Sequence, residues 1–272
     1  MIEAIIALVF GLLIGSFLNV CIHRWPRGRS VVRPRSHCVR CRKMIAWYDN
    51  IPVLSYIILG GRCRHCGRRI SLRYPIVELA TGLLWFYFVA TLGLSALAVK
   101  LCLFSAIVIA LVFSDLEKRL LPDQFTLGGT VIGLAFSAFV PVPDMTGQAL
   151  LWVFGAELHS NRPRSVWESM VGAFLPTLFL WGKKWLYQKF RHREGLGLGD
   201  VKLIAMVGSF LGLRGALLTL ILGSISGSIL GYGFIRLTGK DASTYELPFG
   251  TFLGAAALTA ALTSDKMLSW YL

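Results

Sequence analysis

The chain has 272 residues, of which 55% are hydrophobic and only 15% charged, and its mean hydropathy is positive. This composition excludes an ordinary soluble protein, because one soluble core does not bury so many apolar residues, and it makes lipid the solvent for most of the chain. The formal net charge is +14, which in a membrane protein is mainly a topology signal, since positively charged loops stay in the cytoplasm.

Apolar blocks of about 17–25 residues recur along the chain, the length that a helix needs to cross ~30 Å of hydrocarbon. We therefore expect an all-α polytopic membrane protein with about eight transmembrane helices. The first block has no basic segment before it and no small-residue cleavage site, which indicates a retained helix rather than a signal peptide. The predicted spans are 2–22, 75–94, 97–115, 124–140, 165–182, 196–213, 216–237 and 247–263.

The charge pattern predicts the topology. If eight helices alternate, all but five of the 28 Lys and Arg residues fall on one side, which is then cytoplasmic, with both termini outside. The apolar segment 148–158, which contains Glu157, is too short for a span. Counting it as a ninth span would move the basic cluster 183–193 outside. We interpret it as an interfacial or re-entrant part of an external loop, 141–164, without a chemical motif.

Residues 23–74 form the longest polar stretch, which indicates a small cytoplasmic domain between the first span, 1–22, and the remaining membrane domain, 75–272. It contains Cys38-Val-Arg-Cys41 and Cys63-Arg-His-Cys66, two Cys-x-x-Cys pairs separated by 21 residues. This spacing is typical of one Zn²⁺ held by four thiolates, with a redox-active dithiol pair as the alternative. Four thiolates leave no position for water, so we expect a structural zinc that lets this short segment fold.

Three acidic residues lie within the predicted spans, where ionisable groups are costly and usually functional. Asp115 ends the third span, Asp200 lies near the start of the sixth, and Glu78 lies near the start of the second. The alternation places Asp115 and Asp200 on one membrane face, so we expect two carboxyls that share a proton and activate water against an amide carbonyl. For Asp115 alone, the alternative is a solvated charge at a helix end.

Asp200 lies within Gly197-Leu198-Gly199-Asp200. Because glycine has no side chain, backbone or a substrate strand can approach the carboxylate closely. Lys202 does not complete a phosphate-binding loop, and the strand–turn–helix context of such a loop is missing, which argues against nucleotide binding.

Together these blocks resemble the type IV prepilin leader peptidases, also called prepilin peptidase/N-methyltransferases. The resemblance covers nearly the whole chain except the loop 141–164, which carries none of the shared motifs. It rests on Gly15-Ser16-Phe17-Leu18-Asn19-Val20, the two cysteine pairs, Asp49-Asn50-Ile51-Pro52-Val53-Leu54-Ser55-Tyr56, Arg73-Tyr74-Pro75-Ile76-Val77-Glu78-Leu79, Asp115 with Leu121-Pro122-Asp123, Gly197-x-Gly199-Asp200 and Pro248-Phe249-Gly250.

The resemblance implies a multi-pass enzyme of the bacterial inner membrane that cleaves the leaders of prepilins and pseudopilins after a glycine, at the cytoplasmic face. It implies Asp115 and Asp200 as the catalytic pair, at the positions that match the family's two aspartates. The supporting residues on this interpretation are Asp123, Gly197, Gly199 and Lys202.

In this family the same enzyme commonly methylates the new N-terminal amine with S-adenosylmethionine, and members without the cysteine loop are typically peptidases only. The resemblance therefore implies the bifunctional form. No glycine-rich fingerprint marks the methyl-donor site in this sequence. Glu78 is a candidate contact for the donor or the substrate amine, and a helix N-terminal charge favoured by the helix dipole is the alternative.

Two other classes of protein compete with a protease. A zinc-knuckle membrane adaptor would bind anionic lipid or nucleic acid through the basic loop, but few aromatic residues there are placed to stack on bases, so we expect no nucleic acid partner. A proton-coupled transporter would use Asp115, Asp200 and Glu78 as a relay, but the sequence shows no inverted repeat.

Overall fold

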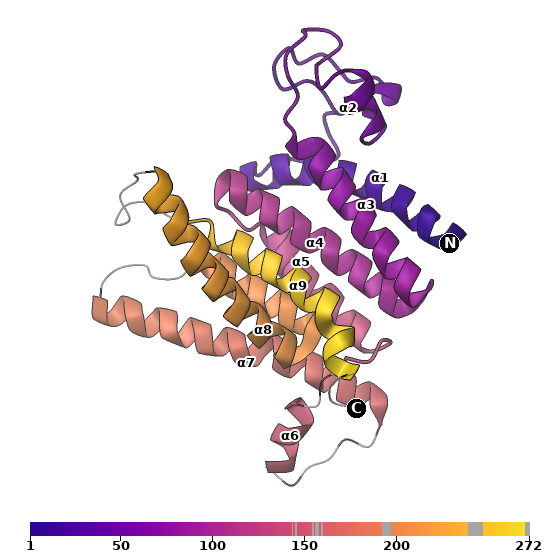
Figure 1. Cartoon of the computed structure of the whole chain (residues 1–272). Helices are drawn as coiled ribbons and strands as arrows, with labels where there is room; N and C mark the ends of the chain where they lie inside the picture. The colour runs from indigo at the N-terminus through magenta and orange to yellow at the C-terminus, as the bar shows by residue number, and fades with distance from the viewer. Residues whose placement is uncertain are drawn as a thin grey trace. The chain divides into compact units, whose positions relative to one another are not determined.

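In the computed structural model the described residues form helices and loops, with two isolated β-bridges and no strand among them (Figure 1). The chain divides into two compact units, Met1–Ser114 and Asp115–Leu272. The structure describes residues 1–142, 144, 146–153, 155, 158, 160–191, 197–238 and 247–269.

The first unit consists of three long apolar helices and a small irregular segment. The long helices are α1 (Ile2–Arg24), α3 (Arg73–Leu92) and α4 (Ala96–Lys118), whose last turn enters the second unit. The irregular segment projects beyond one end of α3 (Figure 1) and contains the short helices η1 (Trp25–Arg27), η2 (Trp47–Asn50) and α2 (Leu54–Ile58).

Helices α1 and α3 pack closely and antiparallel because glycine occupies the crossing points. A Cβ added at Gly11 would lie 2.8 Å from the Cα of Gly82, and one added at Gly15 would lie 2.7 Å from the Cα of Glu78. Side chains at these positions would force the two backbones apart. One turn further along α1, the Asn19 side chain donates a hydrogen bond to the carbonyl oxygen of Tyr74 (3.1 Å), which is a polar contact within an apolar interface.

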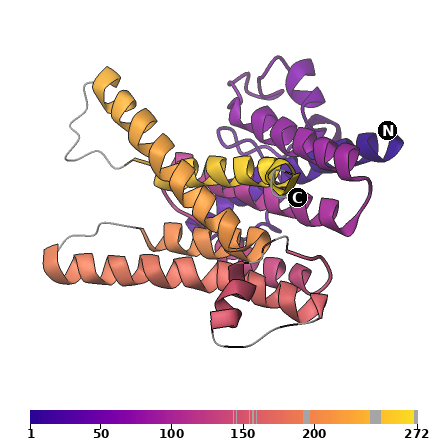
Figure 2. The same cartoon turned by 60° about the horizontal axis from the view of Figure 1, so that its bottom comes forward.

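The second unit contains α5 (Asp123–Ser137), α6 (Thr146–Val153), α7 (Asn161–Arg191), α8 (Leu198–Thr238) and α9 (Phe249–Ser269). Helix α8 is interrupted at Gly212, whose φ of 74° and ψ of −174° are not helical. Figure 2 shows the first segment of α8 lying along α7 and the second turning away from it. A Cβ at Gly172 of α7 would lie only 2.5 Å from Gly212, so glycine permits this contact as well.

Each predicted span falls on a helix, and the sixth and seventh spans share α8 on either side of Gly212. Four helical stretches are long and apolar enough to cross a membrane: Ile2–Arg27, Arg73–Leu92, Ala96–Lys118 and Leu198–Phe234. The prediction of a helical membrane protein is therefore confirmed, whereas the count of eight spans stays a prediction. Helix α7 runs through Arg191, so most of the predicted basic loop 183–193 is helical. Glu157 and residues 192–196, where the sixth span was predicted to begin, lie outside the described residues.

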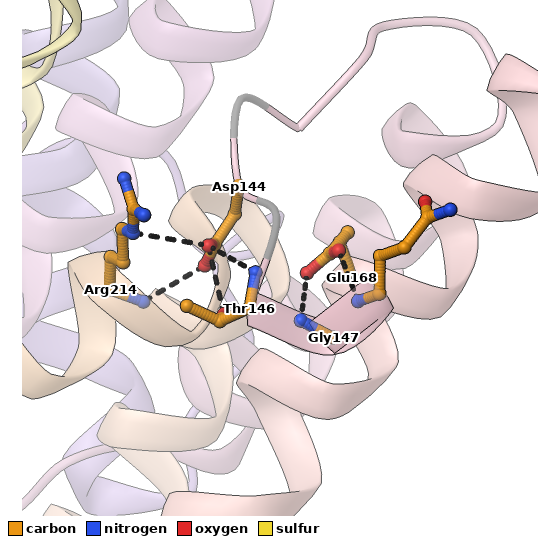
Figure 3. Close-up of polar contacts among 6 residues, drawn as sticks. Asp144, Thr146, Gly147, Glu168 and Arg214 are labelled. Carbon is orange, nitrogen blue, oxygen red and sulfur yellow. Dashed lines mark hydrogen bonds and ion pairs between the residues drawn. The ribbon is translucent and has the colours of Figure 1, made fainter. Parts of the chain in front are cut away.

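The loop 141–164, predicted to lack a chemical motif, contains α6 and is fastened by two buried carboxylates (Figure 3). Glu168 of α7 accepts hydrogen bonds from the backbone N–H groups of Gly147 (2.7 Å) and Gln148 (2.8 Å), at the start of α6. Asp144 accepts from Thr146 and from the backbone N–H of Arg214 (3.0 Å), where α8 resumes after its break. Each carboxylate thus satisfies donors that a helix N-terminus leaves without partners.

Candidate functional site

Asp115 lies in the last turn of α4 and is only 5% exposed. Its Oδ2 atom accepts two hydrogen bonds from Thr251, one from the backbone N–H (2.7 Å) and one from the hydroxyl (2.9 Å). Thr251 is the third residue of α9, and the first N–H groups of a helix have no partner within it. Asp115 therefore caps α9 across 136 residues of sequence, and Oδ1 accepts no hydrogen bond from any described residue.

Glycine at position 250 favours the close approach of α9 to Asp115. A Cβ added there would lie 3.1 Å from the Asp115 carboxyl carbon and 3.0 Å from Leu121 Cδ1. Sequence reasoning singled out Pro248-Phe249-Gly250 but missed Thr251, the next residue. A hydroxyl residue directly after that motif, at a helix start, was the available signal.

Asp200 is the third residue of α8 and is held locally rather than from a distant helix. Its carboxylate accepts a hydrogen bond from the backbone N–H of Gly197, the residue before the helix begins. This is the acidic half of a capping box, in which the third helical residue reaches back to the helix start. A Cβ on Gly197 would lie 3.0 Å from the Asp200 carboxylate, so the glycine leaves room for this turn.

The two aspartate motifs meet in the second unit. A Cβ added at Gly199 would lie 3.1 Å from Leu121 Cβ, so the residues before α5 pack directly on the start of α8. Lys202 Nζ lies 2.7 Å from Asp123 Oδ1 and joins the same two motifs on their exposed side. Asp115 is close enough for its charge to act on Asp200. The structure thus gathers two carboxyls that can divide the work of base and acid.

Lys184, on α7, is a further neighbour of this pair. It is almost fully buried, and its charge also acts on Asp200. Sequence reasoning counted it only as one cation of a basic cluster. Nothing in the local pattern separates it from Lys183, because burial against the α8 start depends on how α7 packs.

The four predicted zinc ligands converge in the first unit. The sulfur atoms of Cys38, Cys41, Cys63 and Cys66 all lie within 4.8 Å of one another, and those of Cys38 and Cys66 are 3.9 Å apart. Four sulfurs in a tetrahedron at 2.3 Å from Zn²⁺ would be about 3.8 Å apart. The donor set and its spacing therefore fit a tetrahedral zinc ion.

The two cysteine pairs have the same backbone fold. The N–H of Cys38 donates to Lys43 O (3.0 Å), and the N–H of Cys63 donates to Arg68 O (2.9 Å). Arg64, which lies between Cys63 and Cys66, forms a bidentate ion pair with Asp49 of η2 (2.6 and 2.8 Å). That hydrogen bonding from Arg64 holds the pKa of the Asp49 carboxyl below its usual range.

Glu78 is buried in the second turn of α3, where its Oε2 accepts a hydrogen bond from the backbone N–H of Val53 (2.8 Å). Val53 precedes α2 and has a positive φ of 60°, which is rare for a β-branched residue. Glu78 therefore ties the cysteine segment to α3. Its role as a contact for the methyl donor or the substrate amine stays a prediction.

Comparison with known proteins assigns the family. The bacterial peptidase A24 N-terminal domain model matches residues 9–92, and the type IV leader peptidase family model matches residues 102–232. A prepilin leader peptidase/N-methyltransferase of Aeromonas salmonicida is 35% identical over 293 residues, covering 97% of this chain and 92% of that protein. The chain belongs to the type IV leader peptidase family.

Other relatives carry the same name. The protein of Myxococcus xanthus is 37% identical, covering 89% of this chain and 66% of its own length, and that of Pseudomonas aeruginosa is 33% identical, covering 97% and 92%. No solved structure matches this chain. The leader peptidase model includes Asp115, Asp123, Asp200 and Lys202, and the N-terminal model includes the four cysteines.

Proposed function

We propose that this protein is a membrane aspartyl endopeptidase that removes the leaders of type IV prepilins and pseudopilins after a glycine, and that it methylates the new N-terminal amine with S-adenosylmethionine. Family membership and the names of the relatives support both activities. The observation that carries the peptidase chemistry is the meeting of Asp115 and Asp200 at the ends of two helices.

In the proposed reaction, one carboxylate takes a proton from water as the water oxygen attacks the scissile carbonyl, and the other carboxyl donates a proton to the carbonyl oxygen. Thr251 occupies Oδ2 of Asp115, which leaves Oδ1 to face the water and makes Asp115 a well-oriented base. Asp200, which is held by one local hydrogen bond and lies near the charge of Asp115, then acts as the acid, because two neighbouring carboxyls do not both ionise readily.

The four cysteines hold a structural Zn²⁺ in this proposal. The ion supplies a cross-link between two distant parts of the segment 23–74, which is too short to bury a core of its own. We place the enzyme in the bacterial inner membrane with the cysteine segment and both aspartates on the cytoplasmic side, because most of the Lys and Arg residues then lie inside.

The test is cleavage of a prepilin-like peptide by purified protein in detergent. We expect cleavage by the wild type and none by Asp115→Asn or Asp200→Asn, since an amide can act as neither base nor acid here. Glu117→Gln is the matched control, because it removes an exposed carboxylate two residues from Asp115. Cleavage by either aspartate variant would exclude the paired mechanism, and no cleavage by the wild type would exclude the peptidase.

A labelled methyl donor in the same reaction tests the second activity. The expected result is label on the cleaved peptide only, because the accepting amine does not exist before cleavage. Pre-cleaved peptide given to Asp115→Asn should also become labelled, since that carboxyl has no role in methyl transfer. Cleaved but unlabelled product from the wild type would show a peptidase alone.

A further inference from the structure

Helix α2 buries its polar side and exposes its apolar side. Ser55 is only 6% exposed, and its hydroxyl oxygen accepts from the Ile51 N–H (3.0 Å) while donating to Tyr48 O (2.9 Å). Ile57 and Ile58, on the other side of the turn, are 68% and 69% exposed. With Leu54, also exposed, they follow the i, i+3, i+4 spacing that places three side chains on one helix face. A turn facing water would bury the aliphatic residues and expose the serine.

The neighbouring helix η2 exposes an aromatic pair. Trp47 and Tyr48 of η2 are both exposed and contact each other edge to face, with ring centroids 5.7 Å apart. Tryptophan and tyrosine are enriched where a protein meets the boundary between lipid and water, because one end of each ring is apolar and the other polar. We call Leu54, Ile57 and Ile58 the α2 face.

A hydrogen bond holds the start of α2 beside α3, a helix that can cross a membrane. Val53, immediately before α2, donates its backbone N–H to Glu78, which lies in the second turn of α3. Helix α3 is long and apolar enough to cross a membrane. Glu78 is five residues past the start of α3, about 7 Å along its axis. The first turn of α2 is therefore held beside the membrane end of α3.

The charges of the segment 24–73, which contains the α2 face, complement an anionic lipid surface. From Arg24 to Arg73 the chain has thirteen Lys and Arg residues and a single acidic residue, Asp49. Asp49 is itself paired with Arg64. Lys and Arg side chains near an anionic bilayer surface are attracted to it. Apolar side chains at the surface and surrounding cations are the two components of interfacial membrane binding.

We propose that the α2 face inserts into the boundary between headgroups and acyl chains of the bilayer beside α3, with arginines of the segment 24–73 on anionic phospholipid headgroups. The occupant of this face is lipid, not a protein partner. The insertion holds the cysteine segment flat against the membrane surface at a third point, in addition to its chain connections to α1 and α3. It does not depend on the proposed peptidase chemistry.

The chain offers a convenient test, because residues 44–62 contain no Lys or Arg before Arg62 and trypsin releases them as one peptide. Zinc-loaded full-length protein is reconstituted in vesicles of phosphatidylcholine and phosphatidylglycerol that contain a phospholipid with a diazirine in its acyl chain. After photolysis, we expect label on the peptide 44–62, at Leu54, Ile57 and Ile58. Omission of phosphatidylglycerol should lower the yield, since the cations then lose their partners.

The matched variants are Ile57→Asn with Ile58→Asn, and Val32→Asn, which changes an exposed aliphatic residue outside the α2 face. The double variant should lose the label and Val32→Asn should keep it. Bound zinc, one ion per chain, is measured in both variants, and a double variant that has lost zinc is replaced by Leu54→Asn alone, which should also lower the label.

Three results overturn the proposal: no label on residues 44–62 in the wild type, equal label in the zinc-loaded double variant, or label from a diazirine-bearing prepilin peptide but not from lipid. The last result would identify the α2 face as a substrate surface instead. Prepilin cleavage is measured in the same vesicles. A wild type that fails to cleave but shows the lipid label would contradict the proposed function and leave this inference intact.

Discussion

The two aspartates of the candidate site are held in opposite ways. Asp200 bonds to Gly197 within its own helix start, so its position is set by a few neighbouring residues. Asp115 is held by two hydrogen bonds from Thr251, which is 136 residues away on α9. One carboxyl therefore depends on local chain geometry and the other on hydrogen bonds from the start of α9. Changes to α9 should affect Asp115 and spare Asp200.

The largest loss of cleavage is expected when either aspartate is replaced. Asp115→Asn and Asp200→Asn should each lower cleavage by at least about 10³-fold, because each eliminates one half of an acid–base pair. The double variant should be no worse than either single one, since the two groups act together. Initial rates on a prepilin-like peptide measure this. Additive losses in the double variant would indicate two independent roles.

The next largest loss of cleavage is expected from a change on α9, which holds Asp115 but not Asp200. Gly250→Ala should lower kcat by roughly 10²-fold, because the added Cβ lies 3.1 Å from the Asp115 carboxyl carbon and displaces it. Gly128→Ala on α5 is the control, since a Cβ there meets nothing within 4 Å. Cleavage by the two variants should differ while their thermal stability stays similar. A fully active Gly250→Ala protein would show that Asp115 does not require this close approach.

Thr251→Val should have a smaller effect, about tenfold on kcat, because it removes the hydroxyl donor but keeps the side-chain shape and the backbone N–H. Thr251→Ser should restore most of the rate, since it restores the donor. Methylation of a pre-cleaved peptide should be unchanged in both variants, which distinguishes misplacement of Asp115 from general unfolding. If the serine variant is as slow as the valine variant, the hydroxyl does not position Asp115.

The smallest effect is expected at the exposed pair that joins the two motifs. Lys202→Met should lower cleavage by less than about threefold, because solvent-exposed ion pairs contribute roughly 0–1 kcal/mol. Raising the salt concentration should bring the wild type closer to the variant, since salt screens exposed charges. A loss as large as that of Gly250→Ala would mean that Lys202 touches the substrate.

Much of the architecture could be predicted from local patterns. Apolar block lengths located the helices, including the two segments of α8 that Gly212 separates, and the Cys-x-x-Cys spacing identified four sulfur atoms that converge. The loop 141–164 could not be read in this way. The two buried carboxylates that hold it, Asp144 of the loop and Glu168 of α7, accept hydrogen bonds from backbone groups of α8 and α6 whose positions no local pattern specifies.

For the aspartates, sequence patterns alone predict that Asp115 and Asp200 lie at costly positions near helix ends, and that glycines flank Asp200. Those features depend on residues within a few positions of each other. The three-dimensional structure adds that Thr251 donates hydrogen bonds to Asp115, that Glu78 accepts one from Val53, and that the isoleucines of α2 are exposed. The physical reason is that a hydrogen bond between distant helices depends on how whole helices pack, which neither spacing nor hydropathy encodes.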